Sequence, residues 1–319
     1  MKVFRRITWA MLASMTAVSI ISLTVPASAT EMRAGSFVPL LAGPDGPESY
    51  VAPELSIVPQ AVPAKFVVTY VGFPAAAKTA FQRAVNIWAS LISSPVPITV
   101  RATYTPLAVG VLGAAGPGVI VRDFPGAPQK GTWYVEAVAN KRAGKQLAAA
   151  SPDIVASFSS AFPNWYFGAG TSPAGKYDFT TVVLHELGHG LGFLGLGRVS
   201  GGVGAIKALG FPSIYDRYVE NTAGTPILKF ADPSKALAGQ FQSNGLWLDS
   251  PTVRAANSNL RAKLFAPKTF LPGSSYSHLD EATYKQGNPN SLMTPALNMA
   301  ETIHSPGPIS LAIFKTVGW

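Results

Sequence analysis

The residues best suited to chemistry are His185, Glu186 and His189, which form the pattern H-E-x-x-H. They lie in a strongly periodic apolar run that begins after Asp178, a residue able to cap the start of a helix. Helical residues four apart project from one face, so both imidazoles can reach the same metal ion. Two neutral imidazoles and an adjacent carboxylate are typical of a zinc site, with Glu186 as the general base toward a water molecule.

The alternative is a buried helix with two hydrogen-bonded histidines, because three fixed letters can recur by chance. Three polar groups in an apolar helix cost free energy unless they are paired or bind a metal. Two of the four histidines of the chain also lie here. Glycines at 188, 190 and 192 each disfavour a helix by about 1 kcal/mol relative to Ala, which indicates a close approach or a sharp exit. These observations favour the zinc site.

A catalytic zinc ion usually takes three protein ligands and keeps one position for water. The compact metzincin pattern H-E-x-x-H-x-x-G-x-x-H would place the third ligand at Gly195, which cannot ligate. A carboxylate at Glu220 or Asp216 would instead make a His₂-carboxylate site of the thermolysin type. Asp216 has Arg217 as its neighbour and Glu220 leads into a turn-like sequence, so we interpret both as structural.

Two histidines remain as possible third ligands, His278 and His304. His278 stands in S-H-L-D-E, and Met293 follows it in S-L-M-T-P. Taken by itself, His278 beside acidic residues could be a surface histidine, and Met293 could be an ordinary core residue. Composition and spacing leave these alternatives open.

The order H-E-L-G-H-G-L-G-F, a long insertion, S-H-L-D-E and S-L-M-T-P resembles the leishmanolysin branch of the metzincin zinc metalloproteases. The resemblance covers mainly Tyr177 to Gly197 and Ser274 to Trp319, in a shorter, cysteine-free chain of the kind expected for a bacterial secreted relative. It implies that His278 is the third zinc ligand and that Met293 forms the methionine turn beneath the zinc. His304 follows Met293 and is therefore the second choice.

Periodicity predicts the elements around this motif. Strands are expected at 66–71, 98–104, 119–124 and 153–160, with helices at 74–92 and 309–317. The stretch from Trp133 to Arg142 could be a helix or an edge element. A strand, a long helix and further strands indicate a helix packed across a sheet.

The resemblance extends this expectation to an α+β, metzincin-like fold. It implies an upper subdomain (64–195) of twisted mixed sheet with two long helices. An irregular lower subdomain (196–319) would hold the methionine turn and the C-terminal helix, with zinc in the cleft between them. It also implies that a peptide binds extended along a sheet edge in the strand before residue 178, taken here as Asp153 to Ser160.

The first 29 residues read as a secretory signal peptide. Lys2, Arg5 and Arg6 make a basic start, an apolar stretch follows, and Ala27-Ser28-Ala29 fits a small-residue cleavage site. An uncleaved signal anchor is the alternative. Thr30 to Pro63 is rich in Pro, Gly and Ala and could be a linker, a pro-segment or an N-terminal arm. We expect a protein that is secreted, extracellular or periplasmic, without a stable membrane anchor after signal cleavage.

Composition excludes several other classes. The 319 residues, 48% of them hydrophobic, can bury one large domain or two subdomains. The absence of cysteine excludes a disulfide framework and a thiolate that could hold zinc inactive. The net charge of +9 includes the three basic residues of the signal, so it falls to +6 without them. The remaining basic residues are scattered, and no nucleic-acid partner is expected.

The sequence therefore predicts a secreted zinc endopeptidase (a hydrolase) that acts on protein or peptide substrates through Glu186. No Cys-His pair and no G-x-S-x-G run competes with this interpretation. Two alternatives stay open: a thermolysin-like peptidase using Glu220, and a non-catalytic exported binding or adhesion domain. Cleavage specificity, calcium requirement and oligomeric state are not predicted.

Overall fold

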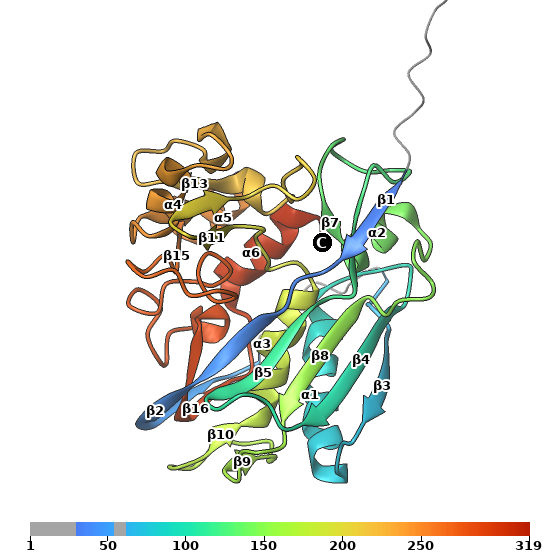
Figure 1. The fold of residues 1–319 in the computed structure, drawn as a ribbon. Helices are drawn as coiled ribbons and strands as arrows, with labels where there is room; N and C mark the ends of the chain where they lie inside the picture. Colours follow the sequence, from blue (N-terminus) through green and yellow to red (C-terminus); the bar gives the residue numbers. More distant parts are fainter. Residues whose placement is uncertain (1–29, 54–61) are drawn as a thin grey trace, which may run out of the picture.

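The computed structural model describes residues 30–53 and 62–319. The predicted signal peptide lies outside the described residues. The fold is mixed α+β, with several sheets and, in the described part of the chain, six α-helices (Figure 1). None of the helices in the described ranges is long and apolar enough to cross a membrane.

The largest sheet has six strands in the order β16-β2-β5-β8-β4-β3. Three of them are mutually parallel and were predicted from the sequence: β3 (Phe66–Val71), β4 (Ile98–Thr105) and β8 (Ile154–Ser159). Three were not predicted: β2 (Val38–Val51), β5 (Val111–Pro117) and β16 (Ala296–Ile303). Strand β5 is antiparallel to both neighbours, β8 and β2, whereas β16 runs parallel to β2.

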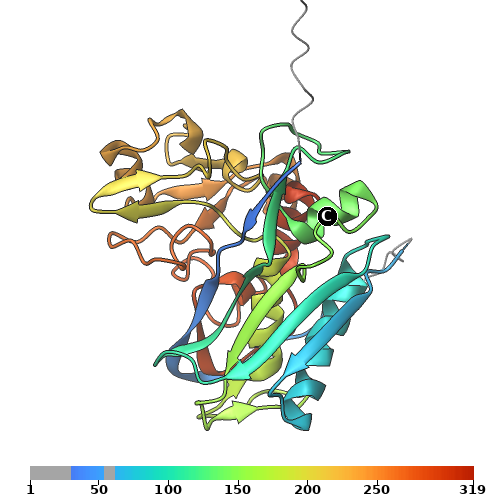
Figure 2. The same cartoon turned by 45° about the vertical axis from the view of Figure 1, so that its right-hand side comes forward.

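Two helices pack on one face of this sheet, α1 (Ala75–Leu91) and α3 (Phe179–Gly190); Figure 2 shows both behind the strands. Helix α1 forms because its apolar residues recur every three or four positions, which gives one buried face. The buried side chains are Ala77, Ala80, Phe81, Ala84, Val85 and Trp88. Trp88 Nε1 donates to Leu184 O at 2.9 Å, so α1 directly supports the middle of α3.

Smaller elements surround this layer. A three-stranded sheet contains β1 (Glu31–Ala34), β6 (Val119–Arg122) and β7 (Tyr134–Val135), which leads into α2 (Glu136–Ala143). A second one contains β13 (Val219–Asn221), β14 (Leu246–Leu248) and β15 (Ala262–Leu264). Two-stranded pairs are β9 (Trp165–Tyr166) with β10 (Tyr177–Asp178), and β11 (Arg198–Ser200) with β12 (Val203–Ala205). The remaining helices are α4 (Lys235–Phe241), α5 (Pro251–Ala256) and the predicted C-terminal helix, α6 (Gly307–Val317).

One expectation about this architecture needs correction. The strand at Asp153–Ser160 is not a sheet edge, because β8 lies between β5 and β4. Of the alternatives left open for Thr30–Pro63, a plain linker does not fit the described residues, because they form β1 and β2, and β2 is an internal strand of the main sheet (Figure 1). The sheet also takes β16 from beyond residue 195, so it crosses the boundary expected between the two subdomains.

Candidate metal centre

Helix α3 carries the H-E-x-x-H residues and is buried along its whole length. It begins where Asp178 caps it, since Asp178 Oδ2 accepts a hydrogen bond from Thr181 N at 2.8 Å. The same carboxylate oxygen pairs with His304 Nε2 at 2.8 Å. His304 is therefore bound to the helix cap, away from the other three histidines.

Three histidines converge at the other end of α3. The Nε2 atoms of His185 and His189 are 2.9 Å apart, and His278 Nε2 lies 3.3 Å from His185 Nε2. All three ligand atoms lie within 4.8 Å of one another, and each of the three residues is 0% exposed. The fold thus brings His278 to the helical pair across a separation of 93 residues from His185.

Each imidazole is oriented by a backbone carbonyl. The Nδ1 atoms of His185, His189 and His278 lie 2.6, 2.8 and 2.7 Å from the carbonyl oxygens of Leu292, Phe193 and Ser274, respectively. A carbonyl only accepts, so each Nδ1 carries the proton and donates it. Each Nε2 lone pair then faces the others, an arrangement that is repulsive unless a cation lies between them.

Electrostatics keep these imidazoles neutral, as metal ligands must be. Burial, with the neighbouring His278 second, lowers the pKa of His185 to about 3. Burial lowers the pKa of His278 to about 4. The pKa of His189 is also well below its usual value, because of burial first and the other two histidines second. The three buried histidines are close enough to bind a metal ion, and their chemistry fits one.

The predicted methionine turn lies directly under α3. Residues Ser291–Met293 form a 3₁₀ turn, and Leu292 supplies the carbonyl that holds His185. A Cβ at Gly188 would lie 2.9 Å from Met293 Sδ, so the absence of a side chain at 188 lets this turn approach the helix. The sulfur of Met293 therefore packs on α3 between the two histidine positions.

At Gly195, where the compact pattern has its third ligand, an aromatic ring occupies the space that a side chain would need. A Cβ at Gly195 would lie 2.0 Å from the ring of Tyr276, which is 0% exposed. Tyr276 is two residues before His278, and its hydroxyl donates to Asp216 Oδ1 at 2.8 Å. The glycine thus admits the segment that delivers His278.

Glu186 follows His185 on α3, and its side chain is buried against strands β2 and β5. Its Oε1 accepts a hydrogen bond from Leu40 N at 3.2 Å, and its Oε2 has no hydrogen-bond partner within the described ranges. Burial raises the pKa of this carboxyl well above its usual value. A Cβ at Gly113 of β5 would lie 3.0 Å from Glu186 Oε1, so this glycine makes room for the carboxylate.

The two carboxylates considered as ligands lie in other networks. Glu220 Oε1 forms an ion pair with Arg261 at 2.6 Å. Asp216 accepts from the backbone N–H groups of Leu196 and Ser213 at 3.0 and 2.7 Å. Both hold loops in place, in agreement with the structural role inferred from their neighbours. Only His185, His189 and His278 group as metal-ligating residues among the positions described.

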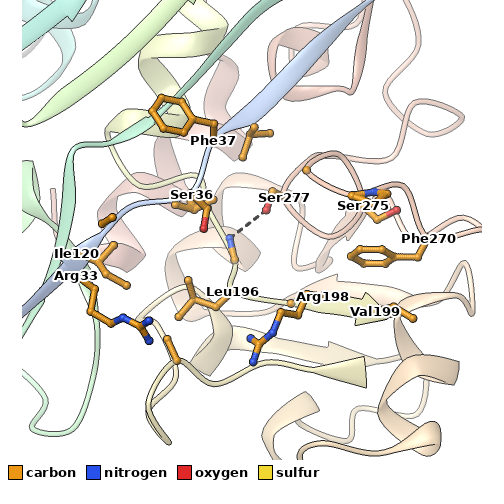
Figure 3. Close-up of a pocket in the computed structure, with 18 residues that line it drawn as sticks. Arg33, Ser36, Phe37, Ile120, Leu196, Arg198, Val199, Phe270, Ser275 and Ser277 are labelled. Carbon is orange, nitrogen blue, oxygen red and sulfur yellow. Dashed lines mark hydrogen bonds between the residues drawn. The ribbon is translucent and has the colours of Figure 1, made fainter. Parts of the chain in front are cut away.

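A cavity of about 400 Å³ is lined by segments that flank the histidines in the chain, but by none of the three histidines themselves. Its walls are the exit of α3 at 194–199, the 270–277 loop before His278 and residues 33–38 of the N-terminal segment. Figure 3 shows Ser277 beside Leu196 and Ser36, and Ser277 Oγ accepts from Gly195 N at 3.2 Å. The cavity therefore lies where the loop before His278, the segment that follows α3 and residues 33–38 meet.

Sequence reasoning missed the contribution of backbone groups and of the N-terminal strand. The carbonyls that orient the imidazoles have no side-chain signature, and Leu40 contributes its N–H rather than its side chain.

Comparison of the chain with known protein families, with curated proteins and with solved structures found no match. The assignment of a metal centre therefore stands on the geometry and chemistry of the three histidines.

Proposed function

We propose that this chain is a zinc-dependent endopeptidase with a metzincin-like site. The observation that carries the proposal is the convergence of three buried, neutral Nε2 atoms, two of them from the helix that also carries the buried Glu186 carboxyl. Three histidine ligands are the set used by catalytic zinc sites that leave one position open. The methionine turn beneath α3 agrees with the metzincin resemblance of the sequence.

The donor geometry suits zinc. Zinc–imidazole bonds of about 2.0–2.1 Å at tetrahedral angles separate two ligand nitrogens by about 3.3 Å. The separations of 2.9 and 3.3 Å from His185 Nε2 are near this value. Imidazole nitrogen also suits copper, iron and nickel, but a neutral set of three imidazoles with no carboxylate favours zinc. When bound, zinc would lower the pKa of a water molecule and polarise the scissile carbonyl.

The chain's own residues supply the proton transfers. Glu186 would accept a proton from the attacking water and pass it to the leaving amine. Its Oε2 has no hydrogen-bond partner in the described part of the chain, and Oε1 is oriented by a backbone N–H. The hydrogen bonds from Nδ1 to carbonyls hold the three imidazoles in the tautomer required for binding zinc.

The proposal includes export, because the first 29 residues read as a signal peptide. It also includes an extended protein or peptide substrate, because sheets bind peptides in extended conformation. A thermolysin-like site using Glu220 is not favoured, because that carboxylate is paired with Arg261. A non-catalytic exported binding domain would keep the zinc and lack cleavage. Activity therefore has to be measured together with bound zinc.

The test compares the zinc-loaded parent with Glu186→Gln in the cleavage of an unstructured protein. Leu40 covers the Glu186 carboxylate, so both proteins are assayed with and without Leu40→Asp. This substitution places a charge at a buried position and should displace the residue from the site. We expect the chains that carry Glu186→Gln to retain zinc and lose cleavage by roughly 10²–10⁴-fold. In the chains that carry Leu40→Asp, equal cleavage with and without the Glu186 carboxylate, or with and without a chelator, would contradict the proposal.

A further inference from the structure

Strand β2 occupies a position that an extended peptide could take. Its residues 38–40 pair antiparallel with Ala115, Ala114 and Gly113 of β5. On its other side, Leu41 N donates to Pro295 O at 3.1 Å, and pairing with β16 continues from there. Main-chain hydrogen bonds on both sides are the way a sheet captures a peptide strand from another molecule.

This strand also closes the proposed active site. Leu40 N donates to Glu186 Oε1, the oxygen of the proposed general base. Val38 and Leu40 are each 1% exposed, and Glu186 is 0% exposed beneath them. Neither water nor substrate can reach the carboxyl while residue 40 remains in this position.

The edge of β5 is shaped for a close main-chain neighbour. A Cβ at Gly116 would lie 1.9 Å from Ser36 O, and one at Gly113 would meet Glu186. A Cβ at Gly35 would in turn lie 2.0 Å from Pro117 O. Gly116 of β5 and Gly35, which lies just before β2, thus permit the two backbones to approach more closely than side chains would allow.

The rest of the sheet has other supports. Strand β5 is paired with β8 over five positions, from Gly113 to Pro117. Strand β16 is tied to α3, because Thr181 Oγ1 accepts from Ile303 N at 2.8 Å and donates to Ile303 O at 3.1 Å. Ala300 N also donates to Lys176 O at 2.9 Å. Departure of β2 would therefore leave both neighbouring strands anchored.

We propose that residues 36–42 are a built-in inhibitor, a segment of this chain seated along β5 in the place of an extended substrate. The proposal rests on the proposed function, since it identifies what holds that site closed. The absence of cysteine means that no thiolate blocks the metal, and inhibition comes instead from main-chain pairing and from the Leu40–Glu186 hydrogen bond. The site opens when this segment leaves.

The experiment inserts a recognition sequence for a site-specific endoprotease after Pro53, an exposed residue beyond the end of β2. The zinc-loaded chain is studied intact and cut, each with and without Leu40→Asp to drive the segment off. Pro44→Asp is the matched control, because it places the same charge at an exposed position of the same strand. Binding of a leucine-containing dipeptide hydroxamate is measured by calorimetry, together with peptide cleavage and circular dichroism.

We expect the intact chain to bind the hydroxamate at least tenfold more weakly than the cut chain carrying Leu40→Asp, and the Pro44→Asp chain to behave as the intact parent. A synthetic peptide of residues 36–51 should restore the closed state when added to the cut chain. Equal hydroxamate affinity before and after release would overturn the inference. Loss of the folded spectrum on release would also overturn it, because β2 would then be a structural strand. Stronger hydroxamate binding without any peptide cleavage would support the inhibitor segment and contradict the endopeptidase.

Discussion

At the scale of residues, the H-E-x-x-H spacing identified two of the three convergent histidines from helix geometry alone. Spacing could not identify His278, because no local rule connects residues 93 positions apart. That assignment came from the resemblance of the S-H-L-D-E and S-L-M-T-P segments to the metzincin pattern, and the fold brings His278 into the cluster. The backbone carbonyls that orient the rings could not be predicted, since every residue carries one.

The third ligand can be tested by single substitutions. His278→Ala should weaken zinc binding by more than the roughly 10–100-fold typical of removing a partner that only supports a ligand. His304→Ala and Glu220→Ala should retain one zinc ion per chain, because their side chains pair with Asp178 and Arg261 instead. Zinc content after dialysis against a weak chelator gives the comparison. Zinc loss in the Glu220 variant with retention in the His278 variant would reverse the assignment.

Gly195 offers a second test at this scale. Gly195→Ala places a Cβ 2.0 Å from the buried Tyr276 ring, whose hydroxyl is held by Asp216. The ring cannot move freely, so we expect a loss of roughly 1–3 kcal/mol in the free energy of unfolding. Gly239→Ala is the matched control, because nothing lies within 4 Å of its Cβ position in α4, and it should be neutral or mildly stabilising. Similar urea midpoints for both variants would show that the contact at 195 is unimportant.

At the scale of elements, regular patterns were predictable and irregular strands were not. The apolar stripe of α1 and the β-branched runs of β3, β4 and β8 are visible in the sequence and form as expected. Strand β2 contains three prolines and two glycines and β5 contains two glycines and a proline, compositions that indicate turns. Pairing on both sides in the sheet overrides those local preferences.

The contribution of the α3 cap to stability can be measured by substituting Asp178. Asp178→Ala removes the acceptor of Thr181 N and the partner of His304. We expect the free energy of unfolding to fall by about 3 kcal/mol, because the variant loses a helix cap and leaves a buried polar group without its partner. Ser234→Ala removes a cap from α4, where Ser234 Oγ accepts from Leu237 N at 3.0 Å, and should cost only about 1 kcal/mol. Equal losses in chemical denaturation would indicate that the Asp178–His304 pair adds nothing.

At the scale of the whole molecule, α2 carries a buried acidic group that makes stability depend on pH. Glu136 is 0% exposed, and burial, with Asp153 second, raises its pKa from 4.5 to about 8. The unfolded chain releases this proton near the lower value and the folded chain near the higher one. Glu136 therefore makes the free energy of unfolding decrease as the pH rises from about 4.5 to about 8.

Glu136→Gln should remove that contribution. Its free energy of unfolding should exceed that of the parent increasingly across this window, by roughly 1–3 kcal/mol above pH 8. Asp216 and Glu301, whose pKa values burial raises to about 6 and about 7, are present in both proteins and cancel in the comparison. Glu48→Gln, at an exposed position, is the control. A difference between Glu136→Gln and the parent that is independent of pH would contradict the buried carboxyl as its cause.

The most direct test of the metal centre is X-ray absorption at the zinc edge on the purified zinc-loaded chain. The account predicts three imidazole nitrogens at about 2.0–2.1 Å from the zinc, and one imidazole fewer in His278→Ala. A first coordination sphere with only two imidazoles in the parent, or with a protein carboxylate in place of His278, would contradict it.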